Sequence, residues 1–196
     1  KKDEIFLCDS GGQYKYGTTD VTRTLCFSEQ KKSIKKIFTK VLKGHIAVAT
    51  VDLNKKRNGK LIDIEARKFL KKSSLDYSHG TGHGVGFFLN VHEGPQSISK
   101  YNLVKIEKGM ILSNEPGYYK KNNFGIRIEN LIYVAKNSKK LFFKNLTLAP
   151  IEKELIDYDL LTKKEKDYLF KYHFEVYSKI SKFLNNNEKK WLASLI

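Results

Sequence analysis

The sequence predicts an α+β fold, in which strands and helices occupy separate blocks of the chain. Three observations support this: a glycine-punctuated, β-branched stretch near the start, apolar residues at helical spacing after it, and a second strand-rich region followed by a long helical tail. A chain of 196 residues suits one domain with a real core, and its 12 Phe and 11 Tyr favour a folded globule.

The first block, residues 5–28, is typical of a strand, a turn and a strand. Ile5 to Cys8 forms an apolar strand, Gly11, Gly12 and Gly17 punctuate the chain, and Thr18 to Phe27 is rich in β-branched residues.

Two helices follow. From Ser28 to about Leu42 the apolar residues recur at helical spacing, and residues 45–50 extend the pattern. The pair Asn58-Gly59 breaks the chain, and Ile62 to Leu70 predicts a second, shorter helix.

The remaining elements start with a glycine-rich loop, residues 78–86, that runs into the apolar residues 87–89. Residues 103–135 predict two more strands, and residues 147–151 a final one. A helical tail follows, with a polar break at residues 181–190 and one apolar face made by Leu161, Tyr168, Leu169, Tyr172 and Val176. We therefore divide the chain into a first region, residues 1–151, which contains all the predicted strands, and a C-terminal helical extension of the same domain, residues 152–196.

The order of these elements resembles one and a half copies of a unit in which helices precede a hairpin. We expect the helices of the first copy to lie upstream of Lys1, so that the chain is the later part of a longer protein.

The net charge of +16 raises the question of a nucleic-acid or membrane partner. Only four of the 37 basic residues are arginines, and the lysines form many short clusters instead of one stripe. Because direct readers of bases are usually rich in arginine, we expect a solvated surface, with neither nucleic acid nor membrane as partner. No apolar run is long enough to span a bilayer.

The two cysteines, Cys8 and Cys26, do not form the spacing of a disulfide framework. We expect free thiols and a reducing compartment, the cytoplasm.

Four acids and one histidine predict the chemistry. Asp9 and Asp20 lie on either side of a turn before Gly17, and Glu115 and Glu129 lie on either side of a turn at Asn122. If both segments are hairpins, paired acids lie roughly opposite each other, with Cβ atoms about 4.5–5.5 Å apart. Two such pairs and an imidazole can clamp two divalent cations about 3.5–4 Å apart, which predicts a hydrolase site.

Two other interpretations of these motifs are weaker. Asp9-Ser10-Gly11 matches the triplet of aspartic proteases, but it needs a second triplet and leaves the histidines unused. His79 and His83 have the spacing of zinc ligands on a helix, but the intervening glycines make a helix implausible.

Taken together and in order, six motifs closely resemble the catalytic domain of Xaa-Pro aminopeptidases (aminopeptidase P), in the pita-bread metallopeptidase family. The motifs are Asp9-Ser-Gly-Gly-Gln-Tyr14, Gly17-Thr-Thr-Asp20-Val-Thr-Arg-Thr24, His79-Gly-Thr-Gly-His83-Gly-Val-Gly86, Asn90-Val-His92-Glu-Gly-Pro95, Asn114-Glu115-Pro-Gly-Tyr118 and Gly125-Ile-Arg-Ile-Glu129-Asn130. The resemblance is strong over residues 5–151 and continues into the tail, which looks like that of the longer cytosolic branch. It implies a curved antiparallel sheet flanked by helices.

The resemblance also implies residue roles. The metal ligands would be Asp9, Asp20, His83, Glu115 and Glu129, with Asp20 and Glu129 shared by two metal ions. Four carboxylates and one imidazole suit a fairly hard ion such as Mn²⁺, of which the family usually uses two.

Other site residues follow from the same resemblance. Glu115 would accept the proton of the attacking water, and His79 and His92 would bind the substrate or the developing oxyanion. Arg127 shares a strand face with Glu129, and we expect it to orient a carboxylate. A further family histidine would fall before Lys1.

The predicted function is the hydrolysis of the bond between an N-terminal residue and a following proline in peptides. One alternative is another enzyme of the same fold, prolidase, which cuts Xaa-Pro dipeptides. The other is not an enzyme: a metal-free pita-bread scaffold that binds proteins or nucleic acid. The longer branch commonly dimerises through this domain, so we expect a homodimer.

Overall fold

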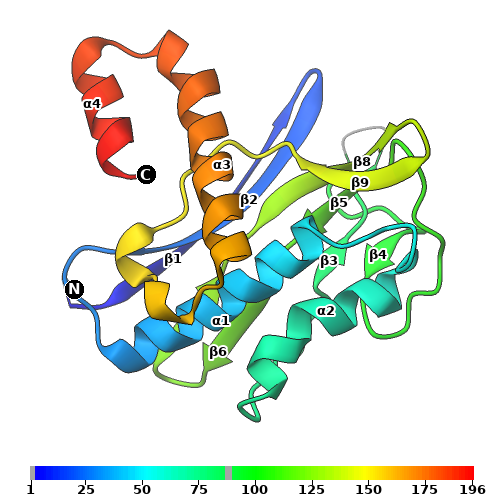
Figure 1. Ribbon diagram of the computed structural model, residues 1–196, viewed down its shortest axis with the longest axis horizontal. Coiled ribbons are helices and arrows are strands. Elements are labelled where there is room, and N and C mark those ends of the chain that lie inside the picture. The colour runs from blue at the N-terminus through cyan, green and yellow to red at the C-terminus, as the bar shows by residue number, and fades with distance from the viewer. Residues whose placement is uncertain (1–2, 87–89) are drawn as a thin grey trace.

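Within the described residues the strands pair in antiparallel fashion, and the longer helices lie against them (Figure 1). The computed structural model describes residues 3–86 and 90–196, so the predicted apolar run at residues 87–89 lies outside the described residues. The strands are β1 (Ile5–Tyr14), β2 (Gly17–Cys26), β3 (Gly82–His83), β4 (Ser97–Ile98), β5 (Ile111–Asn114), β6 (Gly117–Lys120), β7 (Phe124–Arg127), β8 (Asn130–Asn137) and β9 (Lys140–Asn145). The helices are α1 (Lys32–Ala49), α2 (Gly59–Lys71), α3 (Lys163–Ile180) and α4 (Asn186–Ser194), with short 3₁₀ helices at Lys153–Leu155, Tyr158–Leu160 and Ser181–Phe183.

The ladders β5–β8 and β6–β7 are two parts of one long hairpin. Asn114 pairs with Asn130 in the first, and Gly117 pairs with Arg127 in the second, so both ladders share one register. The hairpin is interrupted at Glu115-Pro116 and Ile128-Glu129, where proline removes one backbone donor.

Backbone hydrogen bonds at this interruption join the hairpins into a continuous curved layer. The amide of Glu129 donates to the carbonyl of Thr22 on β2 at 3.0 Å, and the amide of Glu115 donates to the carbonyl of Thr81 at 2.8 Å. The interrupted hairpin therefore lies between β1–β2 on one side and β3–β4 on the other.

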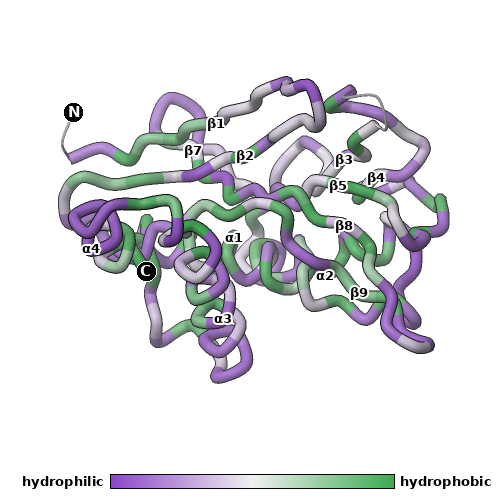
Figure 2. Tube along the Cα trace, turned by 90° about the horizontal axis from the view of Figure 1, so that it is seen from above, coloured by the Kyte–Doolittle hydropathy of each residue, from purple (hydrophilic) through white to green (hydrophobic). Residues whose placement is uncertain are grey.

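Two apolar clusters hold helices against the strands. One joins α1 and α3 to β7, with Phe38, Val176 and Ile126 among its buried residues. The other joins α2 to β5, β8 and β9, through residues such as Ile62 and Ile132. Figure 2 shows α1 between the strand layer and α3, which explains why α1 is buried over much of its length.

The predicted helices are present, and the chain break predicted at Asn58-Gly59 is the N-terminal cap of α2. The side chain of Asn58 accepts a hydrogen bond from the amide of Leu61, so it begins α2. α1 runs without interruption through both stretches that the apolar pattern indicated.

The strand prediction was wrong in several places, and the short strands β3 and β4 were not predicted. Residues 103–135 contain β5, β6, β7 and most of β8 instead of two strands, because the interruption divides the long hairpin. Residues 147–151 are not a strand, and β9, which pairs with β8, was missed. The backbone of residues 149–151 bonds to side chains instead of a ladder: Arg23 donates to the carbonyls of Ala149 and Pro150, and the amide of Ile151 donates to His173.

The tail is helical, but the predicted polar break at residues 181–190 was too long. α4 begins at Asn186, because Asn185 and Glu188 form a capping box. The predicted apolar face of the tail packs on its own domain, since Leu161, Leu169, Tyr172 and Val176 are buried in the same cluster as α1.

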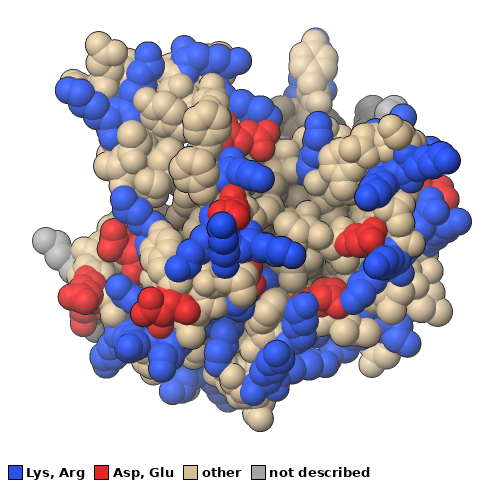
Figure 3. All heavy atoms as spheres, viewed as in Figure 1, with Lys and Arg blue, Asp and Glu red and all other residues tan. Residues whose placement is uncertain are grey.

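No helix in the described ranges is both long and apolar enough to cross a membrane. On the face in Figure 3, the lysine and arginine side chains are spread over several elements, with acidic side chains between them.

Candidate metal centre

The first pair of acids lies on one face of the β1–β2 hairpin. Asp9 pairs with Thr22 and Asp20 pairs with Gly11, so the acids are diagonal neighbours and not directly opposite as expected. The reason is the position of the turn: Tyr14 pairs with Gly17, which centres the hairpin one residue later than the midpoint between the acids. Because opposite residues share a face, both carboxylates still lie on the same side of the sheet.

The second pair of acids lies in the interruption of the long hairpin. The shared register on either side places Glu115 opposite Glu129, as the spacing predicted. Because their amides bond to Thr81 and Thr22, each glutamate is held beside a neighbouring strand that carries further candidate ligands.

His83 on β3 lies beside Asp20 and Glu115. Its Nε2 lies 3.2 Å from Asp20 Oδ2 and 3.5 Å from Glu115 Oε1. Its Nδ1 lies 3.1 Å from the carbonyl of Gly84; a proton on Nδ1 donates there and leaves the Nε2 lone pair toward the acids, as a metal ligand requires. Burial lowers the pKa of His83, but Asp20, whose carboxylate accepts from Nε2 when the ring is protonated, and the nearby Glu115 outweigh it and raise the pKa overall.

The five side chains form two overlapping groups of possible metal ligands. Asp9, Asp20 and Glu129 each offer a ligand atom within 4.8 Å of the others, and so do His83, Glu115 and Glu129. Glu129 belongs to both groups, which is the arrangement that two neighbouring cations with a shared ligand need.

Electrostatics make this cluster suited to cations. Glu129 is 2% exposed, and burial together with the neighbouring Glu115 carboxylate raises its pKa to about 7. Burial also raises the pKa of Glu115. Carboxylates gathered in a partly buried site repel each other until a positive charge compensates them, so the residues present fit a pair of hard divalent ions.

Arg127 on β7 links the acids to their surroundings. Its guanidinium pairs with the carboxylate of Asp9, donates to Thr22 Oγ1 at 3.0 Å and donates to Tyr119 Oη at 2.9 Å. Thr22 Oγ1 in turn donates to Glu129 Oε2 at 2.6 Å. One guanidinium therefore touches one candidate ligand directly and a second through Thr22.

The two other histidines lie at the edge of the cluster. His92 is exposed, and its ring stands edge-on to that of His83 with centroids 4.2 Å apart. It also offers a ligand atom within 4.8 Å of those of Asp20 and His83, which makes these three residues a further possible ligand group. The ring of His79 is held on both sides, with Nδ1 2.7 Å from the carbonyl of Gly80 and Nε2 2.9 Å from Tyr119 Oη. Burial lowers the pKa of His79, which favours the neutral ring.

Three hydroxyl groups at the site were not predicted from the sequence. Ser113 Oγ accepts from the amide of His83 at 2.8 Å and donates to Glu115 Oε1 at 2.9 Å. Thr22 and Tyr119 take the positions just described. A signal existed for two of them, because Thr22 and Ser113 each lie two residues from an acid on a strand and thus share its face.

Side chains of α2 form hydrogen bonds with the loop that carries His79 and His83. Arg67, which is 2% exposed, donates to the carbonyls of Tyr77 and His79 at 2.7 and 2.6 Å. It is paired with Asp63, which also accepts from Thr81 Oγ1 at 2.6 Å. This buried ion pair gives an otherwise irregular loop a fixed shape.

Glycine is required beside His83 by close contacts. A Cβ atom on Gly82 would lie 2.0 Å from the carbonyl oxygen of Ser113, and one on Gly84 would lie 2.1 Å from the carbonyl oxygen of Glu93. The glycine-rich motif thus lets β3 approach its neighbours closely enough for His83 to reach the acids.

The sequence matches known families over nearly its whole length. Residues 1–136 match the description metallopeptidase family M24, and residues 139–195 match the C-terminal region of peptidase M24. The chain belongs to metallopeptidase family M24. A probable Xaa-Pro aminopeptidase P of Coprinopsis cinerea is 47% identical over 98% of this chain and 33% of its own length. Aminopeptidase P2 of Arabidopsis thaliana is 48% identical over 96% of this chain and 28% of its own length.

Solved structures agree with the family. An X-prolyl aminopeptidase of Caenorhabditis elegans, described as a cytosolic enzyme with a di-nuclear active site, superposes with a TM-score of 0.92 at 39% identity, over 99% of this chain and 33% of that one. A prolidase of Pyrococcus furiosus superposes with a TM-score of 0.67 at 28% identity, over 75% and 42% of the two chains. The predicted α+β pita-bread fold is therefore confirmed for this M24 chain, which spans about a third of the length of the curated relatives it matches.

Proposed function

We propose that this M24 chain carries the active site of an Xaa-Pro aminopeptidase, which releases an N-terminal residue from peptides with proline in second place. The observation that carries the proposal is the pair of overlapping ligand groups that share Glu129. The names of its relatives support the choice of substrate, since curated proteins 47–48% identical to it are described as probable Xaa-Pro aminopeptidase P or aminopeptidase P2.

In this proposal five residues hold two divalent ions. Asp20 and Glu129 would bind both ions, Asp9 would complete one site, and His83 with Glu115 would complete the other. Two bound ions would supply an activated water as nucleophile and polarise the scissile carbonyl. We propose Mn²⁺, because the donor set consists mostly of carboxylate oxygens.

The chain's own residues would do the remaining work. Glu115 lies in the cluster with a raised pKa, so its carboxylate is suited to accept the proton of the attacking water. His92 lies at the exposed edge of the cluster, where it would contact the substrate. His79 would form a hydrogen bond with the substrate or with the developing oxyanion. Arg127 would hold the Asp9 carboxylate in place, with Thr22 doing the same for Glu129.

The proposal includes a cytoplasmic homodimer. The cytosolic description of the C. elegans relative supports the compartment. The exposed rings of Phe170 and Phe174 on α3, stacked with centroids 6.4 Å apart, offer an apolar surface for a second subunit. Sedimentation equilibrium of the purified protein measures the oligomeric state, and a monomer at micromolar concentration would contradict the dimer.

The test of function is release of the first amino acid from an Xaa-Pro-Yaa tripeptide with Mn²⁺, beside an Xaa-Pro dipeptide and a tripeptide without proline. We expect cleavage of the proline tripeptide, lost on chelation and restored by Mn²⁺. Preference for the dipeptide would assign the chain to the prolidases, which are also structural neighbours. No cleavage of any peptide by folded, metal-loaded protein would refute the proposal and favour a binding scaffold.

A further inference from the structure

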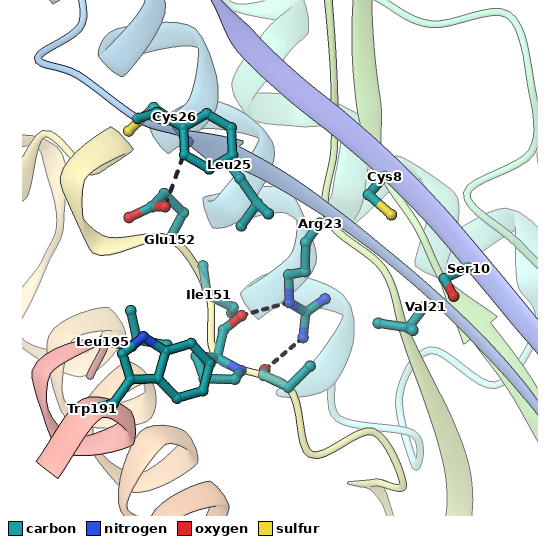
Figure 4. A pocket seen from close by; sticks show the side chains of 13 residues that line it. Cys8, Ser10, Val21, Arg23, Leu25, Cys26, Ile151, Glu152, Trp191 and Leu195 are labelled. Atoms are coloured by element: carbon teal, nitrogen blue, oxygen red, sulfur yellow. Dashed lines mark hydrogen bonds between the residues drawn. The ribbon is translucent and has the colours of Figure 1, made fainter. Parts of the chain in front are cut away.

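Arg23 is a buried cation that no carboxylate in the described part of the chain neutralises by direct contact. It lies on β2, 8% exposed, between two threonines. Because side chains alternate along a strand, Thr22 faces the acid cluster while Arg23 faces the helices behind the sheet. Figure 4 shows its guanidinium pointing from β2 toward the segment that carries Ile151.

All the N–H donors of Arg23 have acceptors. Nε donates to the carbonyl of Pro150 at 2.7 Å, and Nη2 is shared among Asn130 Oδ1, the carbonyl of Ala149 and Tyr172 Oη at 2.8–3.0 Å. Nη1 donates to the carbonyls of Thr22 at 2.8 Å and Glu129 at 2.6 Å. Such a set of acceptors fixes a planar guanidinium in both position and orientation.

The two hydrogen bonds from Nη1 reach backbone carbonyls on the face of the sheet opposite the acid cluster. The carbonyl of Thr22 also accepts the amide of Glu129, so the backbone of Glu129 is bonded through its N–H to β2 and through its C=O to Arg23. On the other side of the sheet, the carboxylate of Glu129 accepts from the hydroxyl of the same Thr22. The position of this carboxylate therefore depends on where Arg23 holds the backbone.

Arg23 is in turn oriented by the C-terminal region. Tyr172 on α3 is 3% exposed; its hydroxyl accepts from Arg23 Nη2 at 3.0 Å and donates to the carbonyl of Ala149 at 2.7 Å. One hydroxyl thus closes the ring of acceptors around the guanidinium, and it comes from a helix outside the part of the chain that bears the five candidate ligands.

We propose that Arg23 and Tyr172 are positioning residues for Glu129, so that helix α3 of the C-terminal region sets the geometry of the metal centre. The inference rests on the proposed function for its catalytic meaning, but the positioning itself concerns only residues of this chain. It assigns the C-terminal region a role in metal binding in addition to its packing role.

The decisive variant is Tyr172→Phe, which removes one oxygen atom and keeps the buried ring. Tyr168→Phe is the matched control, because Tyr168 lies one turn earlier on α3, its ring stacks on Tyr172 with centroids 6.5 Å apart, and its hydroxyl accepts from Asn145 and not from Arg23. Two quantities would be measured on each protein: amide hydrogen exchange of Glu129 in the metal-free state, and the Mn²⁺ dissociation constant by calorimetry. Circular dichroism checks that both variants fold.

We expect Tyr172→Phe to speed exchange of the Glu129 amide by about five- to tenfold and to weaken Mn²⁺ binding by about 10- to 100-fold, while Tyr168→Phe stays within about twofold of the native protein. Unchanged exchange in Tyr172→Phe, or equal changes in both variants, would overturn the inference. If exchange responds as expected but the native protein binds no Mn²⁺, the positioning stands and the proposed metallopeptidase function fails.

Should Tyr172→Phe not fold, Arg23→Lys provides the second test. Lysine keeps the charge but lacks the planar fork, so it cannot bond the carbonyls of Thr22 and Glu129 together with the others. Native exchange at Glu129 in a folded Arg23→Lys protein would equally overturn the inference.

Discussion

Acid should destabilise this protein partly through His173, a buried histidine on α3. The ring is 7% exposed and accepts the amide of Ile151 on Nε2 at 3.1 Å, so it must be neutral there. Burial, with a smaller contribution from the charge of Arg23, lowers the pKa of His173 to about 4. In the unfolded chain the pKa returns to its ordinary value of about 6.5.

The sign and size follow from proton linkage. Between pH 6.5 and pH 4 the unfolded state binds a proton that the folded state does not, so stability falls as the pH is lowered. With a folded pKa of about 4, His173 contributes a loss in the free energy of unfolding of about 1.4 kcal/mol at pH 5.5 and about 2.6 kcal/mol at pH 4.5. The loss is complete only below the folded pKa.

The assay compares native protein with His173→Gln, whose amide oxygen can still accept from Ile151 but does not titrate. Urea denaturation of metal-free protein would be followed by the fluorescence of Trp191, the only tryptophan of the chain, from pH 7.5 to 4.5. His45, whose pKa burial lowers to about 3, and the acid cluster are common to both proteins and cancel in the difference. We expect the stability gap between native and variant to change by about 2.6 kcal/mol in favour of the variant across this range. Parallel stability curves would show that His173 does not titrate on unfolding and would refute the reasoning.

Three further changes test the site. Asp20→Ala, which removes a ligand proposed to bind both ions, should abolish metal content and turnover together; near-normal turnover with unchanged metal, measured by mass spectrometry and peptide cleavage, would contradict the assignment. His92→Ala should keep folding and metal content but lose most of its turnover, and loss of metal instead would make His92 a ligand. Thr22→Val removes the donor to Glu129 and should weaken Mn²⁺ binding by about 10- to 100-fold in calorimetry, whereas the exposed control Thr19→Val should bind as the native protein does.

Local patterns in the sequence predicted the parts of the site that depend on hairpins. The separation of Glu115 and Glu129 around a turn fixed their opposite placement, because pairing in a hairpin is set by its turn. For Asp9 and Asp20 the same reasoning predicted directly opposite positions, whereas the two acids are diagonal neighbours. Nothing in the local sequence revealed that the turn lies at Lys15-Tyr16.

Contacts between distant segments could not be predicted in this way. The bond of Thr22 to Glu129 joins residues on different hairpins, and the reciprocal bonds between His45 on α1 and Asn114 on β5 join a helix to a strand. The missed β9 and the wrong strand at residues 147–151 have the same origin. Whether an extended segment joins a ladder depends on its neighbours, and here residues 149–151 bond to side chains of β2 and α3 instead.

The interrupted hairpin has a consequence for how the protein acquires its metal during synthesis. Asp9 and Glu129 meet only after all the intervening chain has been made and the amide of Glu129 has found Thr22. Contacts of such long sequence separation form slowly compared with local hairpins. A nascent chain that has formed only the β1–β2 hairpin offers the carboxylates of Asp9 and Asp20 but lacks the other three proposed ligands, so it should bind cations weakly and without selectivity. If the five proposed residues hold the metal, its loading is then a late event.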